Sequence, residues 1–335
     1  MSNPKQFCIE PGVDASRTFG QNIAINDKYL VITDSLRNKV TVYTPGNSGE
    51  WERAKEILPP ADLDLSNVSS AFGTGLELDG DVLAISAITK NLEWREASLY
   101  KRDGIFQYIY WRYLTNLETG TPLEPIESLV EPEPESDLVR FNLLRQGKIE
   151  QFILPKMGKK AFGGNQKGTL ALDGNLLLVG YLSEDSTGGA YLFDLARPKA
   201  EPLKLAVEDT ALGGTIAVSQ QFAAVGFDGF FSQFSQGNAR DRSHMTLIRN
   251  LENGASTVIK RFGKVSLSGN ILAVMHIYDY EAPTVSLEVY RLDENAQAHL
   301  IDKREVYRGE VQNGFLFTQT IDDYRRVCIE PLSIN

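Results

Sequence analysis

The chain has 335 residues, with 34 Lys+Arg against 44 Asp+Glu and therefore a formal net charge of −10. Nucleic acid is not expected as the main partner, nor docking on an anionic membrane, because both need a clustered basic face. Hydrophobic residues make up 42% of the chain, which is enough apolar surface to build a folded core.

The N-terminus has no apolar segment of signal-peptide length, and no apolar run approaches the ~20 residues that cross a bilayer. We therefore expect no membrane insertion. A cytoplasmic location is the default expectation, or a secreted or periplasmic one if a signal peptide has been removed.

Five segments of similar sequence follow one another along the chain, each with two short apolar strands. They begin at Phe19, Phe72, Phe162, Leu212 and Phe262, with a weaker sixth start at Phe315. The starts recur at intervals of about 50 residues, or twice about 45 between the second and third, a period typical of β-propeller blades. The first two strands meet at turn pairs that favour tight hairpins, namely Asn26-Asp27, Asp79-Gly80, Asp173-Gly174 and Ser268-Gly269.

Each unit continues with a third strand around an aromatic residue and a fourth, more polar strand. The third strands are expected at 40–43, 97–100, 190–193 and 287–290, and the fourth strand of the second unit at 107–111. The Phe-Gly pair that opens most units has a mechanical interpretation. The ring would wedge between neighbouring blades, while the glycine permits a bend and a close backbone approach.

One unit is irregular, because residues 115–136 carry four prolines among glutamates and predict an acidic loop. Residues 138–143 and 148–154 nevertheless resemble a third and a fourth strand. This unit is therefore either a blade with degenerate inner strands or half a blade.

The last unit is short, with strands expected at 315–320 and 326–330. The N-terminal segment 6–11 and the C-terminal segment 327–331 share the sequence Cys-Ile-Glu-Pro. We expect an N-terminal strand to pair with the C-terminal blade and close the ring. The prediction is an all-β, single-domain β-propeller over 1–335, with seven blades, or six if the Pro-rich unit is not a blade.

Cys8 and Cys328 are the only cysteines, and both lie in these matching segments. They are either a redox clasp or two small buried apolar side chains, and we favour the second interpretation.

The pattern of Phe-Gly, apolar strand, Asp-Gly turn and Leu-Leu-Val-Gly, followed by Gly188-Gly189-Ala190-Tyr191-Leu192-Phe193, resembles the FG-GAP repeat. That resemblance implies a seven-bladed propeller like the integrin α-subunit head, and it says little about function. Many blades of that family carry an Asp-x-Asp-x-Asp-Gly calcium loop, which this sequence lacks. We therefore predict no structural calcium or other metal site.

No catalytic constellation is recognisable in the sequence. His244, His276 and His299 lie far apart in the sequence without metal-ligand spacing, and no nucleotide-binding or hydrolase motif occurs. We expect His276 to be a surface or strand-edge residue. No cofactor and no catalytic residue are expected. The sequence favours a protein that is not an enzyme, and an enzymatic activity stays an open alternative.

The loops after each second strand are the expected functional surface, because they vary most and should emerge on one face of the scaffold. Their aromatic and arginine side chains have the composition of interface hot spots. The candidate partner-binding residues are Arg37, Trp94, Phe230, Phe231, Phe234, Arg240, Arg242, Tyr278 and Tyr280. The rings of the 228–244 loop either face a partner or plug the central channel, and the two alternatives weigh equally.

These observations favour a non-enzymatic scaffold that binds a protein partner through loops on one face. A carbohydrate-binding propeller that stacks sugars on Trp94, Tyr278 and Tyr280 is the alternative. An enzyme with a site at the channel mouth, assembled from distant repeats, is a third and weaker one.

Overall fold

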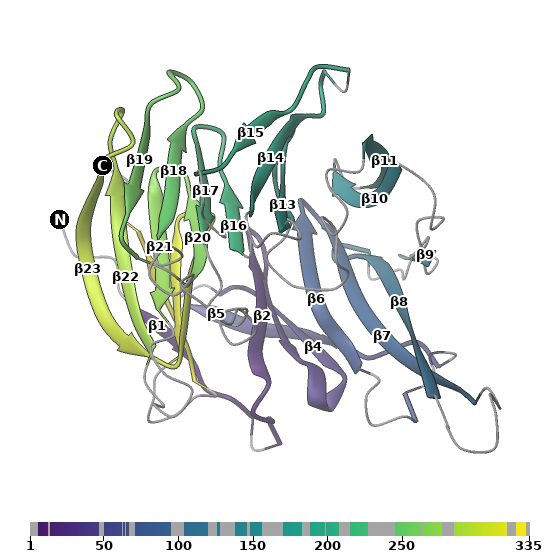
Figure 1. Ribbon diagram of the computed structural model, residues 1–335. Helices are drawn as coiled ribbons and strands as arrows, with labels where there is room; N and C mark the ends of the chain where they lie inside the picture. Colours follow the sequence, from purple (N-terminus) through teal and green to yellow (C-terminus); the bar gives the residue numbers. More distant parts are fainter. Residues whose placement is uncertain are drawn as a thin grey trace. The chain divides into compact units, whose positions relative to one another are not determined.

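Figure 1 shows the computed structural model of the chain, labelled by strand. The structure describes residues 6–12, 14–46, 50–61, 63, 65–66, 71–94, 104–119, 126–127, 138–145, 148–155, 170–182, 188–197, 199–207, 215–226, 245–261, 263–276, 285–319 and 326–332, in some strands by backbone alone. Two compact units emerge, one formed by Ile9–Pro155 and the other by Met1–Cys8 with Lys156–Asn335. Each is described by itself, and the single-domain expectation stays a prediction.

The Ile9–Pro155 unit contains three antiparallel sheets in chain order. The first is β2 (Phe19–Ile25), β3 (Leu30–Asp34), β4 (Lys39–Pro45) and β5 (Trp51–Ile57), with the short 3-10 helix η1 (Ser35–Arg37) between β3 and β4. The second is β6 (Ala71–Asp79), β7 (Val82–Trp94), β8 (Gly104–Asn116) and β9 (Ile126–Glu127). The third has two strands, β10 (Leu138–Arg145) and β11 (Lys148–Pro155).

The other unit contains four four-stranded sheets. Three of them follow chain order: β12 (Leu170–Asp173), β13 (Leu176–Leu182), β14 (Gly188–Asp194) and β15 (Leu203–Leu205); β16 (Thr215–Val218), β17 (Phe222–Gly226), β18 (Thr246–Asn250) and β19 (Ser256–Ile259); β20 (Lys264–Ser268), β21 (Ile271–His276), β22 (Val285–Leu292) and β23 (Ala298–Val306). The fourth joins β24 (Arg308–Gln312), β25 (Phe315–Gln319) and β26 (Val327–Pro331) to β1 (Phe7–Ile9).

Consecutive four-stranded antiparallel sheets are the blades of a β-propeller, which confirms the predicted fold class. The described residues form seven antiparallel sheets, of which six are four-stranded and one, β10 with β11, is two-stranded. In those same residues no helix is long and apolar enough to cross a membrane.

The core lies between neighbouring sheets, because side chains alternate across each strand. In β21, Ile271 and Ala273 pack with Val311 and Leu316 of the following sheet. The alternating residues Leu272 and Val274 instead join the cluster shared with the preceding sheet, which includes Phe222, Ala224 and Ile248. β21 is therefore buried on both faces, whereas the outer strand β5 is mostly exposed.

The Phe72-Gly73 pair behaves as the sequence predicts, while Phe162, Gly163 and Phe262 lie outside the described residues. Phe72 is 1% exposed and packs in one cluster with Val31 and Val40 of the preceding sheet. Gly73 has φ +81°, a conformation that favours glycine. Gly263 has φ +138°, and a Cβ there would overlap the carbonyl oxygen of Met275 on the adjacent strand.

The second sheet differs from its prediction in where its strands begin and end. Residues 107–111, expected as the fourth strand, lie in the third strand β8, and the expected third strand at 97–100 lies outside the described residues. The predicted acidic loop at 115–136 begins within β8 and contains β9, which pairs with Trp111 and Arg112. The strand positions predicted from the repeat period were wrong here because β7 and β8, with thirteen residues each, form a longer hairpin than the other repeats predict. The expected strands at 138–143 and 148–154 are confirmed as the two-stranded sheet.

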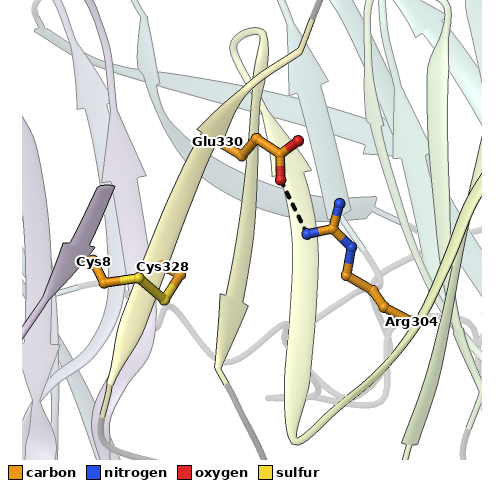
Figure 2. The surroundings of a disulfide bond; sticks show 4 residues. All are labelled: Cys8, Arg304, Cys328 and Glu330. Atoms are coloured by element: carbon orange, nitrogen blue, oxygen red, sulfur yellow. Dashed lines mark hydrogen bonds and ion pairs between the residues drawn. A yellow bond between two sulfur atoms is a disulfide. The ribbon is translucent and has the colours of Figure 1, made fainter. Parts of the chain in front are cut away.

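The pairing of the two chain ends is confirmed, since β1 lies beside β26. The favoured interpretation of the cysteines was wrong, because Cys8 and Cys328 form a disulfide across 320 residues of sequence (Figure 2). The pairing of β1 with β26 places Cys8 beside Cys328, with their Cα atoms 4.0 Å apart.

Candidate functional site

The structure describes only part of the predicted partner-binding surface. Arg37 is described in full and is exposed in η1. Trp94 is described by its backbone. The other candidates, Phe230, Phe231, Phe234, Arg240, Arg242, Tyr278 and Tyr280, lie outside the described residues.

Trp94 was expected in a loop, and this was wrong, because it is the last residue of β7 and pairs with Gly104 of β8. The backbone pairing continues along the strand, with Leu92 opposite Phe106, up to Trp94.

A buried carboxylate anchors the connection between β3 and β4. Asp34 is the last residue of β3 and only 1% exposed. Its oxygens accept hydrogen bonds from the backbone N–H of Ser16 at 2.8 Å, from the Ser16 hydroxyl, and from the Thr18 hydroxyl at 2.9 Å. These bonds satisfy a charge that would otherwise be costly to bury, and they fix the segment before β2 against the turn.

The same segment holds the exposed residues of the turn. The backbone N–H of Leu36 donates to the Thr18 hydroxyl oxygen at 2.9 Å, and Nε of Arg37 donates to the Asp14 carbonyl oxygen at 2.9 Å. Lys39 lies 3.2 Å from the Asp14 carboxylate, and the hydrogen bond from Lys39 lowers the pKa of that carboxyl group.

The far side of the turn is also fixed. Asn38, which follows η1, has φ +53°, and its backbone N–H donates to the Ser35 carbonyl oxygen at 3.2 Å. Its side-chain oxygen accepts the backbone N–H of Phe72 at 2.8 Å, which ties the turn to the next sheet. Leu36 is nevertheless 55% exposed. The turn thus presents an apolar and a cationic side chain on a backbone held from both sides.

A second buried carboxylate, Glu288, lies on β22, which pairs with β21. Glu288 is 1% exposed and faces the apolar interface with the preceding sheet, on the side opposite Leu287 and Val289. Its Oε2 accepts from the Tyr290 hydroxyl and from Nε of Arg261 at 2.7 Å.

Two further groups complete this charged cluster. Nε2 of His276, the last residue of β21, lies 3.3 Å from the same Oε2 atom, and Nζ of Lys303 on β23 lies 3.0 Å from Oε1. His276 was expected at the surface and is instead 1% exposed, so that expectation was wrong. The ring of His276 is buried against the Glu288 carboxylate.

The titration of the cluster follows from these contacts. Burial raises the pKa of Glu288, but hydrogen bonds from Tyr290, Arg261 and Lys303, with the charge of His276, outweigh it and bring the pKa to about 2. Burial and the adjacent carboxylate raise the pKa of Tyr290. A carboxylate this acidic is a poor proton acceptor and a phenol this weak a poor proton donor at neutral pH. The cluster therefore suits a structural role more than acid–base chemistry.

Sequence reasoning missed both buried carboxylates. A signal for Glu288 was present, because it is the one charged residue in the segment Leu287-Glu288-Val289-Tyr290, which otherwise has the pattern of a core strand. Asp34 gave no such signal, because a polar residue at a strand end is ordinary. Among the described residues, no group of three or more His, Cys, Asp or Glu is placed to hold a metal ion.

Comparisons with known proteins give little beyond this geometry. No family model matches the chain, and no curated protein matches it. Among solved structures it is similar to Saccharomyces cerevisiae Sqt1, with TM-score 0.39, 11% identity, and coverage of 92% of this chain and 83% of that one. It is also similar to a prolyl endopeptidase, with TM-score 0.49, 12% identity and coverage of 93% of this chain and 50% of that one. The chain thus spans about half of the endopeptidase, and neither likeness bears on function.

Proposed function

We propose that this protein is a non-enzymatic β-propeller scaffold that holds a protein partner on the loops between the second and third strands of its sheets. The observation that carries the proposal is the turn formed by Leu36 and Arg37. Leu36 is 55% exposed beside the exposed Arg37, and arginine is enriched among the residues that carry interface affinity.

The rigidity of the turn supports the proposal. Hydrogen bonds from Leu36 to Thr18, from Arg37 to Asp14, and from Phe72 to Asn38 fix its backbone and one side chain before any partner arrives. A surface that is already ordered loses less conformational entropy on binding, and more of the contact energy then appears as affinity.

The relationship to FG-GAP propellers belongs to the same proposal. Its support is local, since Gly20, Gly73 and Gly263 each follow a phenylalanine and each have positive φ. The same left-handed backbone conformation, which favours glycine, thus recurs before or at the start of the first strand of several sheets. Such a recurrence indicates a structural repeat.

The test is a pull-down from a lysate of the source organism with wild-type protein and the variant Leu36→Asp, followed by mass spectrometry. Leu300→Asp is the matched control, because Leu300 on the outer strand β23 is 54% exposed. We expect Leu36→Asp to lose a protein that the wild type and Leu300→Asp both retain. Equal recovery with both variants would contradict the assignment of the turn as a binding surface.

A further inference from the structure

In the sheet that contains both β1 and β26, the two strands differ in how firmly they are held. Its outermost strand, β1, has three residues, of which Phe7 and Cys8 are half-buried. Its neighbour β26 has five residues, with Val327, Cys328 and Ile329 buried, and it pairs with β25 at five positions. The disulfide between Cys8 and Cys328 therefore joins a weakly held strand to a firmly held one.

A second contact strengthens the same side. Nη1 of Arg304, on β23 of the neighbouring sheet, donates to Oε2 of Glu330 on β26 at 3.0 Å (Figure 2). β26 is thus fixed by its own sheet and by the next one, independently of Cys8. A three-residue strand at a sheet edge has few backbone hydrogen bonds to offset the entropy of ordering its residues. A cross-link that joins chain segments 320 residues apart removes much of that cost.

We propose that the Cys8–Cys328 disulfide is a redox-controlled clasp: oxidised, it holds β1 on the edge of β26, and reduction releases β1 while β24, β25 and β26 stay paired. The reductant is a small thiol or a protein dithiol. Its thiolate attacks the sulfur of Cys8, the less buried of the two, and Cys328 leaves as a thiolate.

A second thiolate of the reductant then resolves the mixed disulfide and releases Cys8. Two electrons pass from the reductant to the protein, two protons complete the thiols of Cys8 and Cys328, and the reductant becomes a disulfide. Release of β1 uncovers the outer backbone edge of β26, which can then accept another extended segment. The clasp is closed in an oxidising compartment and open where thiols are kept reduced.

Hydrogen exchange measured by mass spectrometry on the full chain tests this, with and without dithiothreitol. We expect exchange at Phe7–Ile9 to become at least tenfold faster on reduction, exchange at Phe315–Gln319 to stay unchanged, and oxidised glutathione to restore the original rates. The variant Cys8→Ala should behave as the reduced protein in either condition.

Three results would overturn the proposal. Phe7–Ile9 that remain protected after reduction would show that β1 does not need the bond. Loss of protection throughout β24–β26 would show a cross-link required for the sheet itself. Two free thiols in protein refolded under oxidising conditions would show that the bond does not form. The outcome is independent of partner binding, and it therefore stands apart from the proposed function.

Discussion

The hydroxyl of Tyr290 donates a hydrogen bond to the carboxylate of Glu288, two residues away on the same face of β22. Both side chains face the apolar interface between two sheets, where a carboxylate without partners would be strongly unfavourable. The tyrosine thus contributes its ring to the core and its hydroxyl to the only buried carboxylate described on that strand.

Substitution Glu288→Gln should destabilise the fold. The amide keeps the shape, but it removes the charge that Arg261, Lys303 and His276 surround, and it leaves two cations without their counter-ion. We expect a loss of about 2–4 kcal/mol in the free energy of unfolding, measured by urea denaturation. The control is Asp293→Asn, which removes a carboxylate at the surface that pairs with His299 and should change stability far less than Glu288→Gln. Equal effects of the two substitutions would contradict the assigned role of Glu288.

The pH dependence of stability should carry the signature of the same residue. The pKa of Glu288 is about 2 in the folded protein, below its ordinary value of 4.5. The folded state therefore binds the proton more weakly than the unfolded state, and this contribution is complete above about pH 4.5 and is lost as the pH falls toward 2. Its size is on the order of 3 kcal/mol.

Urea midpoints measured between pH 7 and pH 3 would detect this. We expect the wild type to lose more stability over that range than Glu288→Gln, whose side chain does not titrate. Parallel curves for the two proteins would show that Glu288 is not the group responsible.

Two glycines of one sheet should respond differently to alanine. Gly263 has φ +138° and faces the Met275 carbonyl oxygen, so a methyl group there meets both strain and overlap. Gly269 has φ +58° with open space around the position of a Cβ. We expect Gly269→Ala to cost about 1 kcal/mol and Gly263→Ala at least about 3 kcal/mol, measured as unfolding free energies. Similar costs would remove the close-approach explanation of the Phe-Gly pair.

Replacement of residues 228–244 by a short Gly-Ser linker tests the second part of the predicted surface. If Phe230, Phe231 and Phe234 contact a partner, the pull-down should lose that partner while the melting temperature changes little. A large drop in melting temperature with the partner still recovered would instead favour rings that pack within the propeller. Thermal unfolding monitored by circular dichroism, run beside the pull-down, separates these outcomes.

Most of the fold could be predicted from the sequence, because each repeated feature depends on residues that are adjacent in the chain. Phe72, Gly73 and the turn glycines Gly174 and Gly269 are requirements of one strand or one turn, and each is visible in a few adjacent residues. Strand ends were less predictable. The position of Trp94 depends on pairing with β8, which propensity alone does not determine.

The site was harder to predict than the fold, because its partners come from different strands. The groups around Glu288 are Tyr290 on the same strand, His276 on β21, Lys303 on β23, and Arg261 in the connection between β19 and β20. The disulfide likewise depends on a pairing between segments at opposite ends of the chain. The shared Cys-Ile-Glu-Pro sequence predicted that pairing, but it could not decide whether two adjacent thiols would be oxidised.

The joined cysteines also determine how the molecule responds to tension. A pull applied to the two termini of the oxidised protein passes through the sulfur–sulfur bond and bypasses the chain between Cys8 and Cys328, which are separated by 320 positions in the sequence. The pull acts only on the short segments outside the two cysteines, among them Ile329, Glu330 and Pro331 of β26, until that bond is cut. A tethered copy stretched in optical tweezers would thus be nearly inextensible before dithiothreitol is added and would lengthen greatly afterwards.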